Sequence, residues 1–379
     1  MAGRLVLMGS GELAPTMVST HRKTLEAVGA SEVVLLDTPF GFQENVDVLT
    51  EKIVEFFDVS LRKPTVVASL RTAAATAAEV ERSLATVRRA RYVFAGPGSP
   101  SYALGIWQSA GIAPAMREVI ANDGAIVLAS AAALTAGLKT IPVYEMYKAG
   151  ADPYWLDGLD LSSAFGLPMT VVPHWNNTDG GNHDTSRCYI GERRLSKLEA
   201  ELEHGILGID EHTAVTIDFG QGTLVVSGAS SAVLRGTDLV TLEAGDTIEL
   251  EKATEILGGA VEQSAATATT TAPDFASALE SGDIDGAVEA ALEVEQEVSA
   301  GDEGRAALRS VIVELGEAAR SGVQDPREVV GGYVEAMLEL RTQARAAKRY
   351  DESDAIRDRL IDLGIEVRDT PDGAEWDLL

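Results

Sequence analysis

The stretch Ala125-Ile126-Val127-Leu128-Ala129-Ser130-Ala131-Ala132-Ala133 decides the fold expected for this chain. Its first five residues form an apolar run typical of a buried strand, and the residues after Ser130 favour a helix. A strand that stops at a serine and continues as a helix is the layout of a nucleophile elbow, whose sharp turn lifts Oγ clear of the sheet edge. The backbone N–H groups behind the serine can face a developing oxyanion. Ser130 is therefore a candidate nucleophile.

Strand-like and helix-like runs alternate on the N-terminal side of this stretch. Such alternation predicts βαβ units around a largely parallel sheet with flanking helices, an α/β fold. Open sheets of this kind bind ligands beyond the carboxyl ends of their strands, where Ser130 and the turn Gly96-Pro97-Gly98-Ser99-Pro100 both fall. The expected strands are Arg4–Met8, Val33–Asp37, Thr65–Ser69, Tyr92–Ala95 and Ala125–Ala129, and the expected helices include Asn45–Phe57, Thr76–Arg89 and Ile112–Asn122.

The pattern changes from about Ile206. Short strands between Gly/Asp turns predict an antiparallel edge that completes a first domain over residues 1–258. A linker is expected over 259–273, where the small polar tract begins at Gln263. A small helical domain is expected over 274–379. The expected edge strands are Thr213–Asp218, Thr223–Ser227, Ala232–Arg235 and Thr247–Leu250, and the expected helices are Phe275–Leu279, Gly286–Val298, Gly304–Ser321, Pro326–Lys348 and Tyr350–Leu363, followed by a short strand Ile365–Val367.

Composition excludes several classes of protein. The chain has 379 residues, 45% of them hydrophobic, which suffices for a sizeable core. No apolar run is long enough to span a membrane, and the N-terminus lacks a signal-peptide pattern, so we expect a cytoplasmic protein. The lone Cys188 excludes an internal disulfide and a multi-cysteine zinc site. With 59 acidic and 31 basic residues, the net charge of −28 argues against a broad phosphate-binding surface.

A serine nucleophile needs a base within hydrogen-bond reach. His174 ends the apolar run that begins at Met169 and opens a polar loop over residues 176–184. If its strand and that of Ser130 belong to one parallel sheet, both side chains lie at the same edge. His183, in the same loop, is the rival base.

Four segments carry a resemblance to a known family. They are the histidine segment from Pro173 through Gly180-Gly181-Asn182-His183 to Arg194-Leu195, the turn Gly96-Pro97-Gly98-Ser99, the motif Leu128-Ala129-Ser130-Ala131-Ala132-Ala133, and Gly208-Ile209-Asp210-Glu211-His212-Thr213-Ala214. Together they resemble, in order over about residues 4–250, the dipeptidase E and cyanophycinase family (peptidase S51). These are serine peptidases with the class I glutamine amidotransferase-like (flavodoxin-like) fold.

The resemblance implies roles for individual residues. Ser130 would be the nucleophile and His174 the general base. Glu211 resembles the cyanophycinase glutamate that orients the histidine, and Glu145 resembles the position of the dipeptidase E aspartate, so the third member is open between them. The remaining implied residues are Gly98 and Ala131, whose N–H groups would form the oxyanion hole, Arg187, which would bind a substrate carboxylate, and Ser99, Asn176 and His183, which would contact the substrate.

Both elbow glycines of the family are replaced here. Leu128 stands two residues before Ser130, and Ala132 stands two residues after it. The resemblance implies hydrolysis of a small peptide or amide through an acyl-enzyme without any cofactor, with a family preference for aspartyl peptides. The replaced glycines motivate an alternative, a catalytically altered or inactive binding protein of the same amidotransferase-like fold that associates with tRNA through its C-terminal domain. A homodimer is compatible with either function.

The C-terminal segment resembles a different family. Arg341 to Tyr350, then Asp354-Ala355-Ile356-Arg357-Asp358-Arg359-Leu360, and finally Asp369 to Trp376 resemble the end of cysteinyl-tRNA synthetases. This implies a tRNA-contacting module. The acidic chain favours instead a reused helical bundle whose basic residues pair with nearby acids. The basic candidates are Arg341, Arg345, Lys348, Arg349, Arg357 and Arg359.

Overall fold

The computed structural model describes residues 3–258 and, with gaps, residues 334–378. These stretches fall in two compact units, each of which is considered by itself. The expected linker and the expected helices over 275–279, 286–298 and 304–321 lie outside the described residues. Within the described part of the chain, every helix is too short or too polar to cross a membrane.

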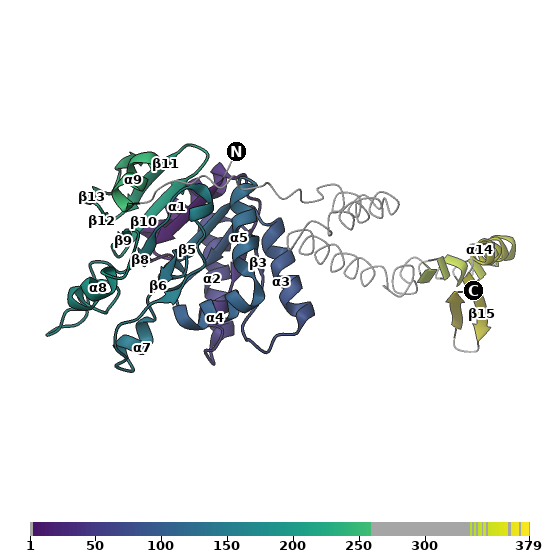
Figure 1. Ribbon diagram of the computed structural model, residues 1–379. Helices are drawn as coiled ribbons and strands as arrows, with labels where there is room; N and C mark the ends of the chain where they lie inside the picture. Colours follow the sequence, from purple (N-terminus) through teal and green to yellow (C-terminus); the bar gives the residue numbers. More distant parts are fainter. Residues whose placement is uncertain are drawn as a thin grey trace, which may run out of the picture. The chain divides into compact units, whose positions relative to one another are not determined.

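The first unit is built on an eight-stranded sheet (Figure 1) with the strand order β14-β11-β10-β1-β5-β4-β2-β3. Strands β1 to β5 pair in parallel, and the other three continue the sheet antiparallel. This confirms the predicted α/β fold with a largely parallel sheet. The strands are β1 (Arg4–Met8), β2 (Val33–Leu36), β3 (Thr65–Val67), β4 (Tyr92–Ala95), β5 (Ala125–Ala129), β10 (Thr213–Asp218), β11 (Thr223–Gly228) and β14 (Thr247–Glu249).

Helices cover both faces of this sheet. Val6, Met8 and Val127 pack in one core with α1 and α2, whereas Leu5 and Leu128 pack in the opposite core with α3, α4, α5 and α9. The central strands are apolar on both faces, as parallel strands between two helical layers must be. The helices are α1 (Pro15–Ala27), α2 (Val46–Leu61), α3 (Ala77–Arg89), α4 (Pro100–Ala110), α5 (Ile112–Ala121) and α9 (Leu250–Leu257).

A second, four-stranded sheet has the order β13-β12-β9-β8. Its strands are β8 (Thr170–Val172), β9 (Ile206–Ile209), β12 (Ser231–Arg235) and β13 (Leu239–Glu243). The condition that the strand before His174 shares a sheet with that of Ser130 is therefore not met, and β12 does not extend the main sheet either. The reason lies in long-range pairing, because β8 pairs in parallel with β9 and β9 pairs with β12, which no local pattern encodes.

The remaining elements of the first unit surround the elbow and the loop after β8. Val172 of β8 shares a core with Leu134, which ends the short helix after Ser130, and with Leu195. The second sheet therefore packs against the elbow. These elements are η1 (Thr38–Phe40), α6 (Ala131–Leu134), β6 (Lys139–Thr140), α7 (Val143–Tyr147), β7 (Leu156–Asp157), η2 (Ser163–Phe165) and α8 (Glu192–Glu199).

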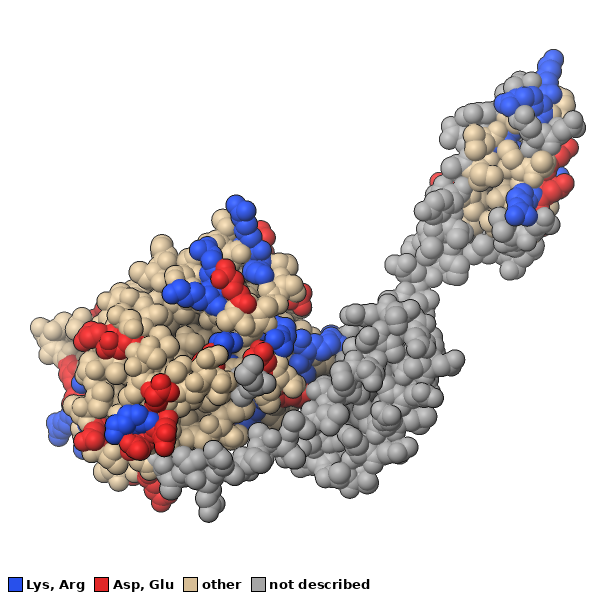
Figure 2. Space-filling model, turned by 90° about the horizontal axis from the view of Figure 1, so that it is seen from above, with Lys and Arg blue, Asp and Glu red and all other residues tan. Residues whose placement is uncertain are grey.

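The described part of the second unit holds the helix α14 (Tyr350–Asp362) and an antiparallel hairpin of β15 (Ile365–Thr370) and β16 (Gly373–Leu378). The helical character is as predicted. The strand β15 is longer than the expected strand 365–367, because its pairing with β16 continues beyond Val367 to Thr370. On the face drawn in Figure 2, basic and acidic side chains of the described residues occur together in both units.

Candidate active site

Ser130 occupies a strained turn at the carboxyl end of β5. Its φ of 52° and ψ of −116° are outside the regions that a residue with a Cβ atom ordinarily adopts. The backbone N–H of Ser130 donates to the Met8 carbonyl at 3.0 Å, which fixes the turn to the end of β1. Such strain is typical of a nucleophile elbow, where it exposes the hydroxyl above the sheet.

The residues that replace the elbow glycines fit into the core. Leu128 and Ala132 are both 0% exposed and belong to the core on the α3–α5 side of the sheet. Leu128 pairs with Leu7 on one side and Ala95 on the other, in unbroken parallel register. The elbow conformation at Ser130 is therefore compatible with both side chains.

His174 follows β8 and meets Ser130 from the second sheet. The distance from Ser130 Oγ to His174 Nε2 is 2.8 Å, and that from His174 Nδ1 to Glu211 Oε1 is also 2.8 Å. A carboxylate can only accept, so Nδ1 carries the proton and Nε2 is left to accept from the serine hydroxyl. This is the arrangement of a nucleophile, its base and an orienting acid.

Two neighbouring asparagines hold Glu211. The Asn177 amide donates from Nδ2 to Glu211 Oε1 at 2.9 Å, and Asn176 Oδ1 accepts from the Glu211 backbone N–H at 2.9 Å. Asn176 thus contacts the backbone of Glu211. Asn177, which is 1% exposed, was not among the residues expected at the site. Its signal was the Asn-Asn pair directly after His174 and Trp175, whose amides can reach back to a nearby carboxylate.

Glu145 lies in a different hydrogen-bond chain. Its Oε1 accepts from Ser101 Oγ at 2.6 Å, and Ser101 Oγ lies 3.2 Å from Ser99 Oγ. Ser99 caps α4 by accepting from the Tyr102 backbone N–H at 3.3 Å. Of the two candidate acids, the structure therefore brings Glu211 to His174 and Glu145 to the base of the turn 96–99.

The turn after β4 requires glycine at residue 98. Gly98 has a φ of 148°, and a Cβ atom there would lie 1.9 Å from the Pro39 carbonyl oxygen. The turn is tied to the elbow by the Ala132 N–H, which donates to the Gly96 carbonyl at 3.4 Å. Among the described residues, neither the Gly98 N–H nor the Ala131 N–H donates to a protein acceptor. Both therefore remain available to a ligand.

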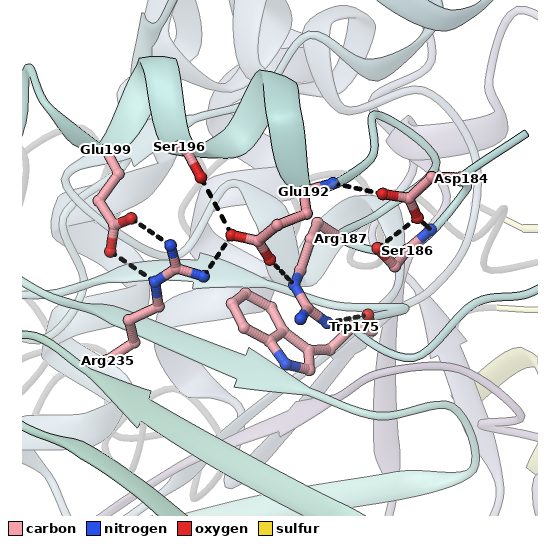
Figure 3. Close-up of polar contacts among 8 residues, drawn as sticks. All are labelled: Trp175, Asp184, Ser186, Arg187, Glu192, Ser196, Glu199 and Arg235. Atoms are coloured by element: carbon pink, nitrogen blue, oxygen red, sulfur yellow. Dashed lines mark hydrogen bonds and ion pairs between the residues drawn. The ribbon is translucent and has the colours of Figure 1, made fainter.

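Arg187 is held by the protein itself (Figure 3). Its Nε donates to Glu192 Oε2 at 2.7 Å, one terminal nitrogen donates to the Trp175 carbonyl at 2.8 Å, and the guanidinium lies 4.0 Å from the Trp175 ring centre. Glu192 also accepts from Arg235 at 2.7 Å. Two of the three guanidinium nitrogens of Arg187 are thus engaged within the protein, and its expected contact with a substrate carboxylate stays a prediction.

The segment that carries Arg187 also supports His174. Arg187, Cys188 and Tyr189 have consecutive positive φ values of 56°, 56° and 67°, and His174 itself has a φ of 48°. The Cys188 N–H donates to the His174 carbonyl at 3.2 Å, and the Tyr189 ring centre lies 5.3 Å from that of His174. Burial raises the pKa of the Cys188 thiol, so this side chain is a protonated core residue.

His183, the rival base, is exposed in the loop and stacks on Tyr147 at 6.2 Å between ring centres. In the described residues the histidine that accepts from the Ser130 hydroxyl is His174. Across 3–258 and the described parts of 334–378, no three His, Cys, Asp or Glu side chains are arranged to hold a metal ion.

Comparison with known proteins supports two similarities. A crystal structure of a peptidase from an acI-B1 Actinobacterium superimposes with a TM-score of 0.54 and 19% identity, covering 66% of this chain and 97% of that one. At this identity the similarity is one of fold, and it confirms the resemblance to peptidases at that level.

The C-terminal segment matches a family described as the cysteinyl-tRNA ligase anticodon binding domain over residues 331–376. The cysteine–tRNA ligase of Nitratidesulfovibrio vulgaris (strain DP4) is 63% identical over 46 residues, which are 12% of this chain and 10% of the relative. That of Cutibacterium acnes (strain DSM 16379 / KPA171202) is 56% identical over 50 residues, or 13% and 10%. The chain thus spans about a tenth of the length of these curated relatives, and the predicted C-terminal resemblance is confirmed.

Proposed function

We propose that this protein is a serine hydrolase that cleaves a small peptide or amide through an acyl-enzyme on Ser130. The observation that carries the proposal is the hydrogen-bonded series Ser130–His174–Glu211, with 2.8 Å at each step. The strained turn at Ser130 and the available N–H groups of Gly98 and Ala131 support it further.

The first step forms the acyl-enzyme. Ser130 Oγ bonds to the carbonyl carbon of the substrate while His174 Nε2 takes the hydroxyl proton. The oxygen that becomes negative accepts from the N–H groups of Gly98 and Ala131. When the tetrahedral intermediate collapses, the carbon–nitrogen bond breaks and His174 returns the proton to the leaving amine.

The second step releases the acid. Water attacks the acyl carbon while Nε2 takes one of its protons, and the proton then returns to Ser130 Oγ as the ester bond breaks. Glu211 stabilises the imidazolium that exists transiently in both steps, and Asn177 keeps the carboxylate oriented toward Nδ1.

A fluorophosphonate probe tests this proposal without knowledge of the substrate, because it reacts with activated serines. We expect the wild-type protein to be labelled at one site, and S130A and H174A to lose the label. The matched control is S163A, which removes another serine of the same unit, in η2. Labelling of S130A at the wild-type rate would contradict the proposal.

A second candidate function is association with tRNA, which the match to an anticodon binding domain favours. Arg345, Lys348, Arg349, Arg357 and Arg359 are exposed, whereas Arg341 is 2% exposed and therefore unsuited to contact a phosphate. Asp and Glu outnumber Lys and Arg over 331–376. The test is whether tRNA co-purifies and is released at high salt. Its absence at low salt would contradict this second function.

A further inference from the structure

The backbone of His174 needs support from its surroundings. It lies two residues beyond the end of β8, and its φ of 48° is uncommon for a residue with a Cβ atom. A backbone in such a conformation persists only where the surrounding structure holds it. Ser130 Oγ and Glu211 Oε1 each lie 2.8 Å from one of its ring nitrogens, so a small shift of this backbone would lengthen both hydrogen bonds.

Trp175, the next residue, ties this backbone to the second sheet. Its N–H donates at 3.0 Å to the carbonyl of Ile209, which ends β9 two residues before Glu211. A Cβ atom on Gly208 would lie 2.4 Å from the Trp175 ring, so the indole lies directly against the β9 backbone. The residue beside the base is therefore in contact with the strand that leads to the acid.

Arg187 makes three contacts with Trp175. Its backbone N–H and one terminal nitrogen donate to the Trp175 carbonyl at 3.0 and 2.8 Å, and its guanidinium carbon lies 4.0 Å from the centre of the indole ring. A planar guanidinium can donate in its own plane while its face lies on an aromatic ring, and the compact ammonium group of lysine has no such face. Arg187 therefore fixes both the main chain and the ring of the residue next to the base.

The guanidinium of Arg187 is itself anchored (Figure 3). Its Nε donates to one oxygen of Glu192 at 2.7 Å, and the other oxygen of Glu192 accepts from Arg235 at 2.7 Å. Arg235 also donates twice to Glu199, so both acids come from α8. Arg235 lies on β12, which pairs with β9. The network thus starts at Trp175 and returns to the sheet against which Trp175 lies.

We propose that Arg187 is a positioning residue, which holds His174 in line with Ser130 through Trp175. This inference rests on the proposed function, because it concerns how the general base of the same site is held. Its consequence is that Arg187 accelerates the reaction of Ser130 even with a reagent that has no carboxylate. A role confined to binding a substrate carboxylate predicts no effect on such a reagent.

An uncharged alkyl fluorophosphonate separates these two roles. Ser130 Oγ bonds to phosphorus, His174 takes the hydroxyl proton and fluoride leaves, so the reaction needs the base but no carboxylate on the reagent. Labelling would be followed by intact mass over a range of reagent concentrations. The data give a limiting rate, the concentration that produces half of this rate, and the final fraction of protein labelled.

The limiting rate should fall about 10- to 100-fold in R187M, since misplacing a catalytic group by about 1 Å can cost about 100-fold. Methionine keeps an unbranched apolar stem and removes every donor of the side chain. The half-maximal concentration should not change, and labelling should still go to completion, because the base is misplaced in folded molecules. R187K keeps the charge without the planar fork and should be slowed at least about 10-fold; it serves as the second variant if R187M does not fold.

R4M is the matched control. The Arg4 side chain is 17% exposed, against 23% for Arg187, and its guanidinium is likewise bonded to an acid, Asp218, at 2.7 Å. Arg4 begins β1, whereas the Ser130 N–H is bonded to Met8 at the other end of that strand. R4M therefore removes a similar ion pair away from the site and should be labelled at the wild-type rate.

The outcomes separate the two proposals. If the wild type is not labelled, the serine hydrolase itself is contradicted. If the wild type is labelled and R187M has the same limiting rate, the positioning role is wrong while the hydrolase stands. The positioning role is also overturned if R187M reacts at the wild-type rate but in only part of the protein, which indicates a loss of folded molecules, or if R187K reacts like the wild type, which indicates that charge alone suffices.

Discussion

Replacing Glu211 with glutamine tests how the imidazole of His174 is held. Both His174 Nδ1 and Asn177 Nδ2 lie within 2.9 Å of the same oxygen, Glu211 Oε1. In E211Q the Asn177 donor excludes the glutamine NH2 group from that position, so the glutamine oxygen should still face Nδ1. The tautomer of His174 is then preserved, and the variant loses charge alone.

The size of the effect follows from the charge. An imidazolium and a carboxylate whose charge centres are ~4 Å apart attract by about 4 kcal/mol at an effective dielectric constant near 20. The Glu211 side chain is 31% exposed, so solvent screens part of this attraction. A loss of about 2 kcal/mol in transition-state stabilisation corresponds to about 30-fold in rate. A wrong tautomer in the Ser-His-Asp template costs about 10⁴-fold.

The assay is the second-order rate of fluorophosphonate labelling. We expect a loss of about 30-fold for E211Q, a far larger loss for the double variant E211Q/N177A, in which the amide can turn, and a much smaller loss for E145Q. A loss of about 10⁴-fold in E211Q alone would refute the reasoning about Asn177. A larger loss in E145Q than in E211Q would refute the choice of Glu211.

Three further predictions concern stability and the turns. Burial lowers the pKa of His21 from 6.5 to about 4, so folding favours the neutral ring, and the free energy of unfolding should be highest above pH 6.5 and fall by about 3 kcal/mol as the pH drops toward 4. Urea titrations of H21Q should lack this pH-dependent part, and an unchanged pH dependence in H21Q would contradict the prediction. L128G, which restores the family glycine, should lower the free energy of unfolding by at least about 3 kcal/mol, because it empties a fully buried site; an unchanged urea midpoint would be inconsistent with this packing. G98A should abolish labelling, because its Cβ would meet the Pro39 carbonyl at 1.9 Å, and labelling at the wild-type rate would show that the turn tolerates a side chain.

The central part of the fold could be predicted because its strands are short apolar runs between clear helices. Arg4–Met8, Tyr92–Ala95 and Ala125–Ala129 have the predicted bounds. The strands after Ile206 could not be assigned to sheets, since β11 and β12 have similar local patterns but pair with different partners. Strand pairing depends on contacts between residues far apart in the sequence, and periodicity carries no such information.

Part of the candidate site could be predicted because two of its residues lie in recognisable local patterns. Ser130 and His174 carry local signals, a strand–serine–helix junction and a histidine after an apolar run. The choice between Glu211 and Glu145 needed coordinates, because both lie in short polar segments and only their position relative to His174 distinguishes them. Nothing in the sequence paired Arg187, whereas in the structure Glu192, five residues later, accepts a hydrogen bond from its Nε.

The acyl-enzyme itself is the most direct test of the account. The protein would be mixed with excess p-nitrophenyl acetate, and both the released p-nitrophenol and the protein mass would be followed in the first turnover. The account predicts a burst of about one equivalent, with the acetyl group on the peptide that contains Ser130 and no burst from S130A. Absence of a burst, or an acetyl group on another residue, would contradict the claim that Ser130 is the nucleophile.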